Sequence, residues 1–117
     1  MRILLEDDQL DTRQLYSLMF RLEGHATTLA ESGEAAIQAA AEQAFDVILM
    51  DAEMHGMNGF TAIKRIRALP QGEKVPIILF TAYSHTEAET HAAGADLLVR
   101  KPILLRDLLE KIKQVRQ

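Results

Sequence analysis

Short apolar runs alternate with helical patterns along the whole chain. The apolar runs are typical of buried strands and occupy residues 3–5, 26–30, 45–50, 75–80 and 95–99. Apolar residues at helical spacing follow the first run at Leu15, Leu18, Met19 and Leu22, and Gly24 is placed to end that helix. The pattern therefore predicts an alternation that starts with a strand.

Four further helices complete the alternation. Ser32 can cap the second helix, the third begins near Gly59, a short fourth covers residues 85–93, and the fifth follows the last strand. Their inward residues are Ala36, Ile37 and Ala40 in the second, Phe60, Ile63 and Ile66 in the third, and Leu105, Leu108, Leu109 and Ile112 in the fifth. Strands that are apolar on both sides predict a five-stranded parallel sheet covered on both faces, the α/β class, in one domain of residues 1–117.

Composition and charge exclude several classes of function. The net charge of -4 and the absence of a Lys and Arg cluster argue against a nucleic-acid-binding surface. The chain has no cysteine and no apolar run of membrane length. Lys64, Arg65 and Arg67, followed by Lys74, are interpreted as a solvated helix face. We expect a cytoplasmic protein that contacts neither nucleic acid nor a membrane.

Residues with reactive or metal-binding side chains follow four of the five predicted strands. They are Glu6, Asp7 and Asp8 after the first strand, Asp51 after the third, Thr81 after the fourth, and Lys101 with Pro102 after the fifth. Ligands of an open parallel sheet bind beyond the carboxyl ends of its strands, so we expect these groups to converge on one crevice. Close carboxylates repel one another unless a cation lies among them, and ligation by oxygen alone favours Mg²⁺.

This set of groups is equipped to move a phosphoryl group. Asp51 can act as the nucleophile and form an aspartyl phosphate, because carboxylates serve as nucleophiles in covalent catalysis. Lys101 can pair with one phosphoryl oxygen, Thr81 can donate a hydrogen bond to another, and the metal ion can spread the charge that develops. We therefore interpret the carboxylate that ends the third strand as a phosphoryl acceptor.

Four segments together resemble the response-regulator receiver domain of two-component signalling, over essentially the whole chain. They are "ILLEDD", "DVILMDAEMHGMNGF", "PIILFTAY" and "GADLLVRKP", in this order. The resemblance implies a doubly wound, flavodoxin-like sheet of strand order 2-1-3-4-5 and a cis peptide bond between Lys101 and Pro102, proline being the residue for which cis is cheap. It implies that Asp51 accepts a phosphoryl group from a histidine kinase or histidine phosphotransfer protein. The phosphorylated domain would then control a partner, an attached output domain or a phosphorylation-dependent homodimer.

The resemblance also implies how Mg²⁺ is held. Asp8 and Asp51 would bind the ion directly, Asp7 would help through water, and the backbone carbonyl of Glu53 would be a further ligand. The run "EDD" offers two acidic pairs. Residues 10–13, set against the usual spacing of the family, favour Asp7 with Asp8, and Glu6 then occupies a position that is usually apolar in the family. The alternative pair is Glu6 with Asp7, and the first helix would then begin one residue late.

Departures from the family pattern concern the conformational switch. Leu98 stands where the family usually has an aromatic switch residue, and the segment after Thr81 is shorter than usual. His55 replaces a frequent proline and is assigned no role. Glu53 and Tyr83 occupy variable positions that flank the phosphoryl site, where they are exposed loop residues or tune dephosphorylation. We expect Thr81 and Tyr83 to move on phosphorylation while Leu98 stays packed.

Two other classes of function stay open at this point. A phosphatase or phosphotransferase of the haloacid-dehalogenase type also uses a strand-end aspartate, a threonine and a lysine, but this chain has its acidic pair first and no room for a cap. A pseudo-receiver that serves only as a binding module would lack part of the acidic set. The receiver interpretation is preferred. It makes the protein no enzyme beyond phosphorylation and dephosphorylation of its own Asp51.

Overall fold

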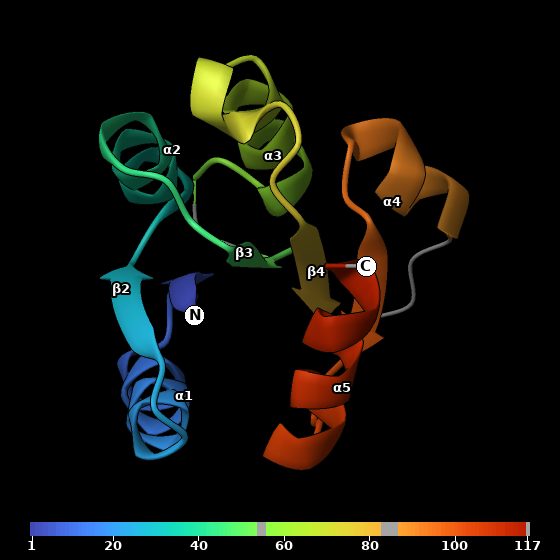
Figure 1. Cartoon of the computed structure of the whole chain (residues 1–117). Helices are drawn as coiled ribbons and strands as arrows, with labels where there is room; N and C mark the ends of the chain where they lie inside the picture. Colours follow the sequence, from blue (N-terminus) through green and yellow to red (C-terminus); the bar gives the residue numbers. More distant parts are fainter. Residues whose placement is uncertain (54–55, 83–86, 117) are drawn as a thin grey trace.

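The computed structural model describes residues 1–53, 56–82 and 87–116, which contain five strands and five α-helices (Figure 1). The strands are β1 (Arg2–Glu6), β2 (Ala26–Ala30), β3 (Val47–Asp51), β4 (Ile77–Thr81) and β5 (Leu97–Arg100). The helices are α1 (Leu10–Leu22), α2 (Gly33–Glu42), α3 (Gly59–Arg67), α4 (Glu87–Ala93) and α5 (Leu105–Val115), with a turn of 3-10 helix at Pro70–Gly72. Among the described helices, none has the length and apolar character needed to cross a bilayer.

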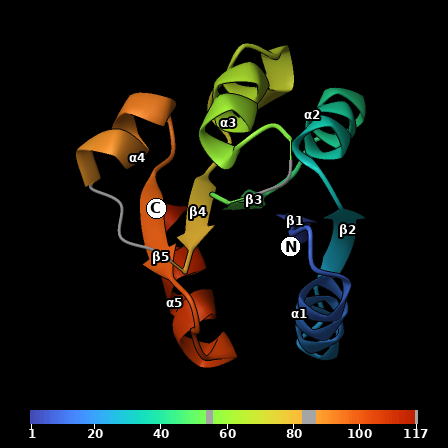
Figure 2. The same cartoon turned by 180° about the vertical axis from the view of Figure 1, so that it is seen from behind.

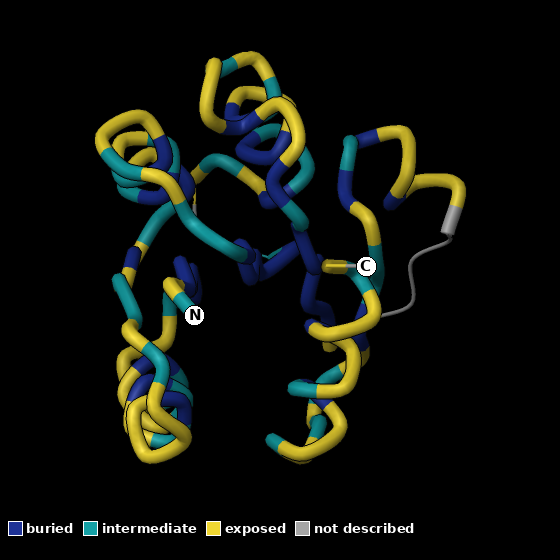
Figure 3. The backbone as a smooth tube through the Cα atoms, in the orientation of Figure 1, coloured by how far each residue is buried: buried dark blue, intermediate teal, exposed yellow. Residues whose placement is uncertain are grey.

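The strands form one parallel sheet in the order β2-β1-β3-β4-β5, which confirms the predicted topology. Helices α2, α3 and α4 lie on one face and α1 and α5 on the other, as the two opposite views in Figures 1 and 2 agree. Each face has its own apolar core, because alternate side chains of every strand point to opposite sides of the sheet. Figure 3 shows the buried positions gathered on the strands and on the sheet-facing sides of the helices.

The last three strands are shifted toward their carboxyl ends relative to the apolar runs that predict them. Each begins two residues later and ends one residue later than its run, so Asp51, Thr81 and Arg100 are strand residues. Asp51 is opposite Phe80 in the β3–β4 ladder, and Thr81 is opposite Arg100 in the β4–β5 ladder. Backbone pairing therefore continues through the first polar residue, which holds the Asp51 and Thr81 side chains at the rigid edge of the sheet.

Helix α1 forms where the apolar spacing predicts it but turns a different face to the sheet. Its buried residues are Arg13, Ser17 and Phe20. Leu15, Leu18 and Leu22, which the apolar pattern places together, are 56%, 48% and 77% exposed. The helix docks through the Phe20 ring and through two polar contacts, Arg13 to the Asp7 backbone and Ser17 to Thr27. Helical period alone marks an apolar stripe, whereas these tertiary contacts decide which stripe faces the core.

Arg67 corrects the interpretation of the basic segment in α3. Its side chain is only 19% exposed, while the other basic residues of that segment are exposed. The guanidinium donates hydrogen bonds to the carbonyls of Gly94 (2.8 Å), Gly72 (3.0 Å) and Val75 (2.5 Å), and to Asp96 Oδ2 (3.0 Å). Five N–H donors in a planar fork suit arginine for this task. Arg67 therefore ties the end of α3 to the segments that enter β4 and β5.

Candidate functional site

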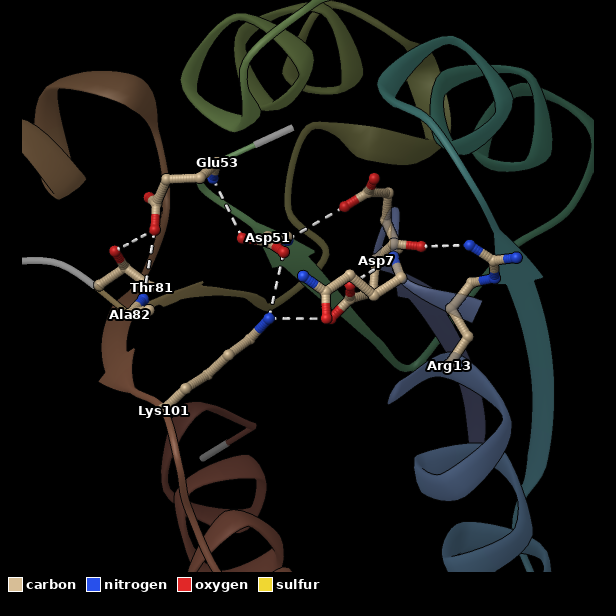
Figure 4. Close-up of polar contacts among 9 residues, drawn as sticks. Asp7, Arg13, Asp51, Glu53, Thr81, Ala82 and Lys101 are labelled. Carbon is tan, nitrogen blue, oxygen red and sulfur yellow. Dashed lines mark hydrogen bonds and ion pairs between the residues drawn. The ribbon is translucent and has the colours of Figure 1, made fainter. Parts of the chain in front are cut away.

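The predicted residues meet at the carboxyl ends of the strands, where parallel pairing brings all strand ends to one edge. Asp51 is the last residue of β3 and Thr81 the last residue of β4. Asp7 and Asp8 directly follow β1, and Lys101 directly follows β5. Figure 4 shows the carboxylates of Asp7 and Asp51 turned toward the Lys101 ammonium.

Lys101 bridges two carboxylates from distant parts of the chain. Its Nζ lies 2.8 Å from Asp7 Oδ2 and 3.1 Å from Asp51 Oδ2. The side chains of Asp7 and Asp51 are 4% and 8% exposed, so little water is available to solvate them. Buried carboxylates are costly without a counter-charge, and the Lys101 ammonium supplies one to both.

Burial and charge act in opposite directions on this cluster. Burial raises the pKa of the Asp51 carboxyl above its ordinary value, although the positive charge of Lys101 and the Glu53 N–H both oppose the rise. Burial would lower the pKa of the Lys101 ammonium, but its hydrogen bond to Asp7 and the charge of Asp51 outweigh this and raise the pKa. Lys101 is therefore a permanent positive charge beside Asp51.

Three carboxylates could hold a hard cation. One oxygen from each of Asp7, Asp8 and Asp51 lies within 4.8 Å of the others. An all-oxygen cluster in which Asp8 is only half-buried fits Mg²⁺, which keeps several waters and takes one or two carboxylates. The acidic pair that reaches this cluster is Asp7 with Asp8, whereas Glu6, the buried last residue of β1, does not belong to it.

Glu6 contacts the backbone of Asp51, a role that the sequence did not predict. The sequence showed only that an acidic residue stands at a position that is usually apolar. Its side chain is 1% exposed, and Oε1 accepts a hydrogen bond from the Asp51 backbone N–H at 3.2 Å. Within the described part of the chain, Glu6 Oε2 is buried without a hydrogen-bond partner. Burial, reinforced by the negative charges of Asp51, Asp7 and Asp8, raises the pKa of Glu6 to about 8. The site thus includes a carboxyl that is largely protonated at neutral pH.

Glu53 connects the loop after β3 to the end of β4. Its backbone N–H donates to Asp51 Oδ1 at 3.0 Å. Its side-chain Oε1 accepts hydrogen bonds from the Thr81 hydroxyl at 2.6 Å and from the Ala82 N–H at 3.2 Å, as drawn in Figure 4. An open cavity of about 290 Å³ lies beside these groups, and its lining consists of Asp8, Gln9, Thr12, Asp51, Glu53, Ala82 and Lys101.

Two residues support the site without having been singled out for it. The buried Arg13 of α1 donates to the Asp7 backbone carbonyl at 2.7 Å and so holds the acidic loop (Figure 4). A Cβ at Gly59 would lie 2.2 Å from the Asp51 carbonyl oxygen, so α3 can begin this close to the acceptor strand only with glycine. An arginine in a predicted helix and a glycine at a predicted helix start carry no sequence signal for these contacts.

The remaining predicted residues have different outcomes. The Lys101–Pro102 peptide bond is cis. Leu98 is half-buried and packs against the apolar core on the α2 and α3 face. Tyr83 and His55 lie outside the described residues. The roles of Leu98 and Tyr83 in switching, and that of the Glu53 backbone carbonyl as a metal ligand, stay predictions.

Comparisons with known proteins agree with this geometry. Residues 3–113 match the family described as the response regulator receiver domain. The regulatory protein AtoC of Escherichia coli is 38% identical over 92% of this chain, which spans 23% of the length of AtoC. The chain therefore belongs to the response regulator receiver family, and the haloacid-dehalogenase alternative is set aside.

Solved structures of this family have the same fold. The chemotaxis protein CheY4 of Vibrio cholerae is 31% identical with a TM-score of 0.92, and 97% of each chain is covered. The response regulator TrrA of Thermotoga maritima, solved in complex with Mg²⁺ and BeF, is 34% identical with a TM-score of 0.85 and the same coverage. The chain is thus a receiver domain of the kind used in two-component systems.

Proposed function

We propose that residues 1–117 are one receiver domain in which Asp51 accepts a phosphoryl group from the phosphohistidine of a kinase or phosphotransfer protein. The observation that carries the proposal is the position of Asp51. Its carboxylate ends a rigid strand, borders an open cavity, contacts the Lys101 ammonium and lies close to two further carboxylates. The downstream target is a protein partner or an attached domain.

The chemistry is a simple transfer. An Asp51 carboxylate oxygen forms a bond to phosphorus while the phosphorus–nitrogen bond of the phosphohistidine breaks, and the electron pair of that bond returns to the imidazole. The Lys101 ammonium, 3.1 Å from Asp51 Oδ2, is placed to stabilise negative charge on the phosphoryl oxygens. Thr81 carries a hydroxyl that can donate to another of these oxygens. Hydrolysis of the acyl phosphate returns the carboxylate, so the covalent chemistry is confined to Asp51.

The acidic cluster would hold Mg²⁺ through Asp8 and Asp51, with Asp7 acting through water. When bound, the ion neutralises charge on the carboxylates and on the phosphoryl group. Support comes from the three carboxylate oxygens within 4.8 Å of one another and from the complex of the similar TrrA with Mg²⁺ and BeF. Asp7 is also committed to Lys101, which fits a role through water.

The direct test is phosphorylation by a small phosphodonor such as acetyl phosphate, with and without Mg²⁺, followed by mass mapping. We expect one phosphoryl group, on Asp51, and only with Mg²⁺ present. Asp51→Asn should abolish labelling, whereas Glu110→Gln, an exposed acid-to-amide change on α5, should leave it unchanged. Stable Mg²⁺-dependent labelling of the Asp51→Asn protein would remove the proposal.

A further inference from the structure

Two hydrogen-bond donors at the end of β4 converge on one oxygen. The Thr81 hydroxyl and the Ala82 backbone N–H both point to Glu53 Oε1, at 2.6 Å and 3.2 Å. A side-chain hydroxyl and an adjacent N–H aimed at one point form an anion-binding arrangement of the type that stabilises oxyanions in enzymes. In this structure the anion is the chain's own carboxylate.

The same donors are placed for a phosphoryl group on Asp51. Asp51, Glu53 and Ala82 line the same cavity. The Glu53 backbone N–H donates a hydrogen bond to Asp51 Oδ1. The residue whose side chain accepts from Thr81 and Ala82 is therefore also bonded to the phosphoryl acceptor. Figure 4 shows the Glu53 side chain extending from the Asp51 loop to Thr81 and Ala82.

We propose that the Glu53 carboxylate is an internal stand-in for a phosphoryl oxygen, which must leave Thr81 and Ala82 before they can bind the phosphoryl group on Asp51. This inference rests on the proposed function. Glu53 is then a residue that sets how readily this receiver accepts and retains its phosphoryl group. It acts through a contact that the unphosphorylated protein already makes.

The Glu53 carboxylate and a phosphoryl oxygen would compete for the same two hydrogen-bond donors. A hydroxyl and a backbone N–H each carry a single hydrogen, so neither can make a full-strength bond to two acceptors at once. A phosphoryl group on Asp51 also adds a charge of roughly -2 near the Glu53 carboxylate, and like charges at short range repel. Glu53 is half-buried, so its carboxylate can be solvated once it is displaced.

The variants of Glu53 separate loss of the contact from loss of the charge. Glu53→Ala removes both, and Glu53→Gln keeps an acceptor oxygen without the charge. Glu53→Asp keeps the charge on a side chain one methylene shorter, which cannot hold the same contacts. Glu110→Gln is the matched control, since it removes one negative charge from an exposed position on α5.

The first measurement is the affinity for beryllofluoride, a phosphoryl mimic, at saturating Mg²⁺ for each variant. Freeing two donors from a charged acceptor should tighten binding about tenfold in Glu53→Ala, with a smaller gain in Glu53→Gln. Glu53→Asp should also bind more tightly than the wild type, though by less than Glu53→Ala because its negative charge remains, and Glu110→Gln should bind like the wild type. If Glu53→Asp binds like the wild type while Glu53→Ala gains, charge alone is responsible and the stand-in role is wrong.

The second measurement is the water-exchange rate of the Ala82 amide in the unphosphorylated protein, by NMR. This amide should exchange faster in Glu53→Ala than in the wild type and be unchanged in Glu110→Gln. An unchanged rate in Glu53→Ala would overturn the inference. If wild type and variants bind beryllofluoride equally well, the stand-in role alone fails; if none of them binds it and none is labelled at Asp51, the proposed function fails with it.

Discussion

At the scale of single residues, the burial of the Glu6 carboxyl is unfavourable for the free energy of folding. Glu6 is 1% exposed and follows three buried apolar residues of β1. One of its carboxyl oxygens accepts a hydrogen bond from the Asp51 N–H, and the other is unpartnered among the described residues. Its raised pKa means that the folded protein holds a proton that the unfolded chain releases. The stability of the fold therefore depends on pH through this group.

We predict that Glu6→Gln flattens the pH dependence of unfolding in the absence of Mg²⁺. Protonated Glu6 stabilises the wild type fully below pH 4.5, and this contribution is lost as pH rises toward about 8. The loss amounts to about 1.4 kcal/mol for each pH unit crossed. The amide keeps an acceptor for Asp51 and never ionises. Denaturant unfolding from pH 5 to 8 should show the difference; parallel curves for wild type and Glu6→Gln would contradict the assignment.

A second prediction at this scale concerns Lys101. The Lys101 ammonium contacts Asp51 and Asp7, and Lys101 is the first residue of the loop between β5 and α5. We therefore expect Lys101 to couple phosphorylation of Asp51 to the conformation of that loop. Lys101→Ala should still be phosphorylated but should show much smaller amide shifts over residues 102–105. The control is Lys111→Ala at an exposed position of α5. Shifts equal to those of the wild type would show that Lys101 does not relay the signal.

At the scale of elements, α1 is held by few but well-buried contacts. The Phe20 ring is fully buried in the core that α1 shares with α5, and Arg13 and Ser17 bond to backbone and side-chain atoms of the β1 and β2 region. The leucine stripe on the opposite side contributes little to this docking, because Leu15, Leu18 and Leu22 remain exposed to water.

Two alanine substitutions in α1 should therefore differ sharply in their effect. Phe20→Ala should lower the free energy of unfolding by about 3 to 5 kcal/mol, since it empties a packed core position. Leu18→Ala should change it by about 0.5 kcal/mol or less, because that side chain is 48% exposed. Urea unfolding of both variants measures the contrast. Equal losses would mean that the face assigned to the core is wrong.

At the scale of the whole molecule, folding brings several carboxylates close together, where their negative charges repel. Two segments far apart in the chain, the loop after β1 and the end of β3, bring Asp7, Asp8 and Asp51 together. The Lys101 ammonium forms ion pairs with Asp7 and Asp51. Repulsion among carboxylates opposes the packing that gathers them. A cation that binds only the folded state should relieve the repulsion and stabilise the protein.

We predict that Mg²⁺ raises the melting temperature of the wild type in a concentration-dependent manner. Asp8→Ala should largely lose this rise, because it removes a carboxylate expected to bind the ion directly. Asp51→Asn should keep a measurable rise, since Asp8 and water remain as ligands. Calorimetry with Mg²⁺, and with K⁺ at matched ionic strength as the control, gives the comparison. An undiminished rise in Asp8→Ala would exclude Asp8 as a ligand.

The sequence by itself determined the parallel α/β architecture and the candidate set of Asp7, Asp8, Asp51, Thr81 and Lys101. It could do so because strand period, apolar runs and strand-end polar residues are local signals, and parallel pairing places all strand ends at one edge. Local order along the chain was sufficient to predict convergence in space. The favoured acidic pair, Asp7 with Asp8, followed from comparison of this segment with the usual spacing of the receiver family.

Only the tertiary structure decided which side of α1 faces the sheet, what Arg67 binds, and that Glu6 and Glu53 act as acceptors beside Asp51. Each of these depends on contacts between segments far apart in sequence: 45 residues separate Glu6 from Asp51, and 28 separate Glu53 from Thr81. A periodic pattern cannot specify such pairings, because the free energy of a buried polar group depends on the particular partner that packing brings to it.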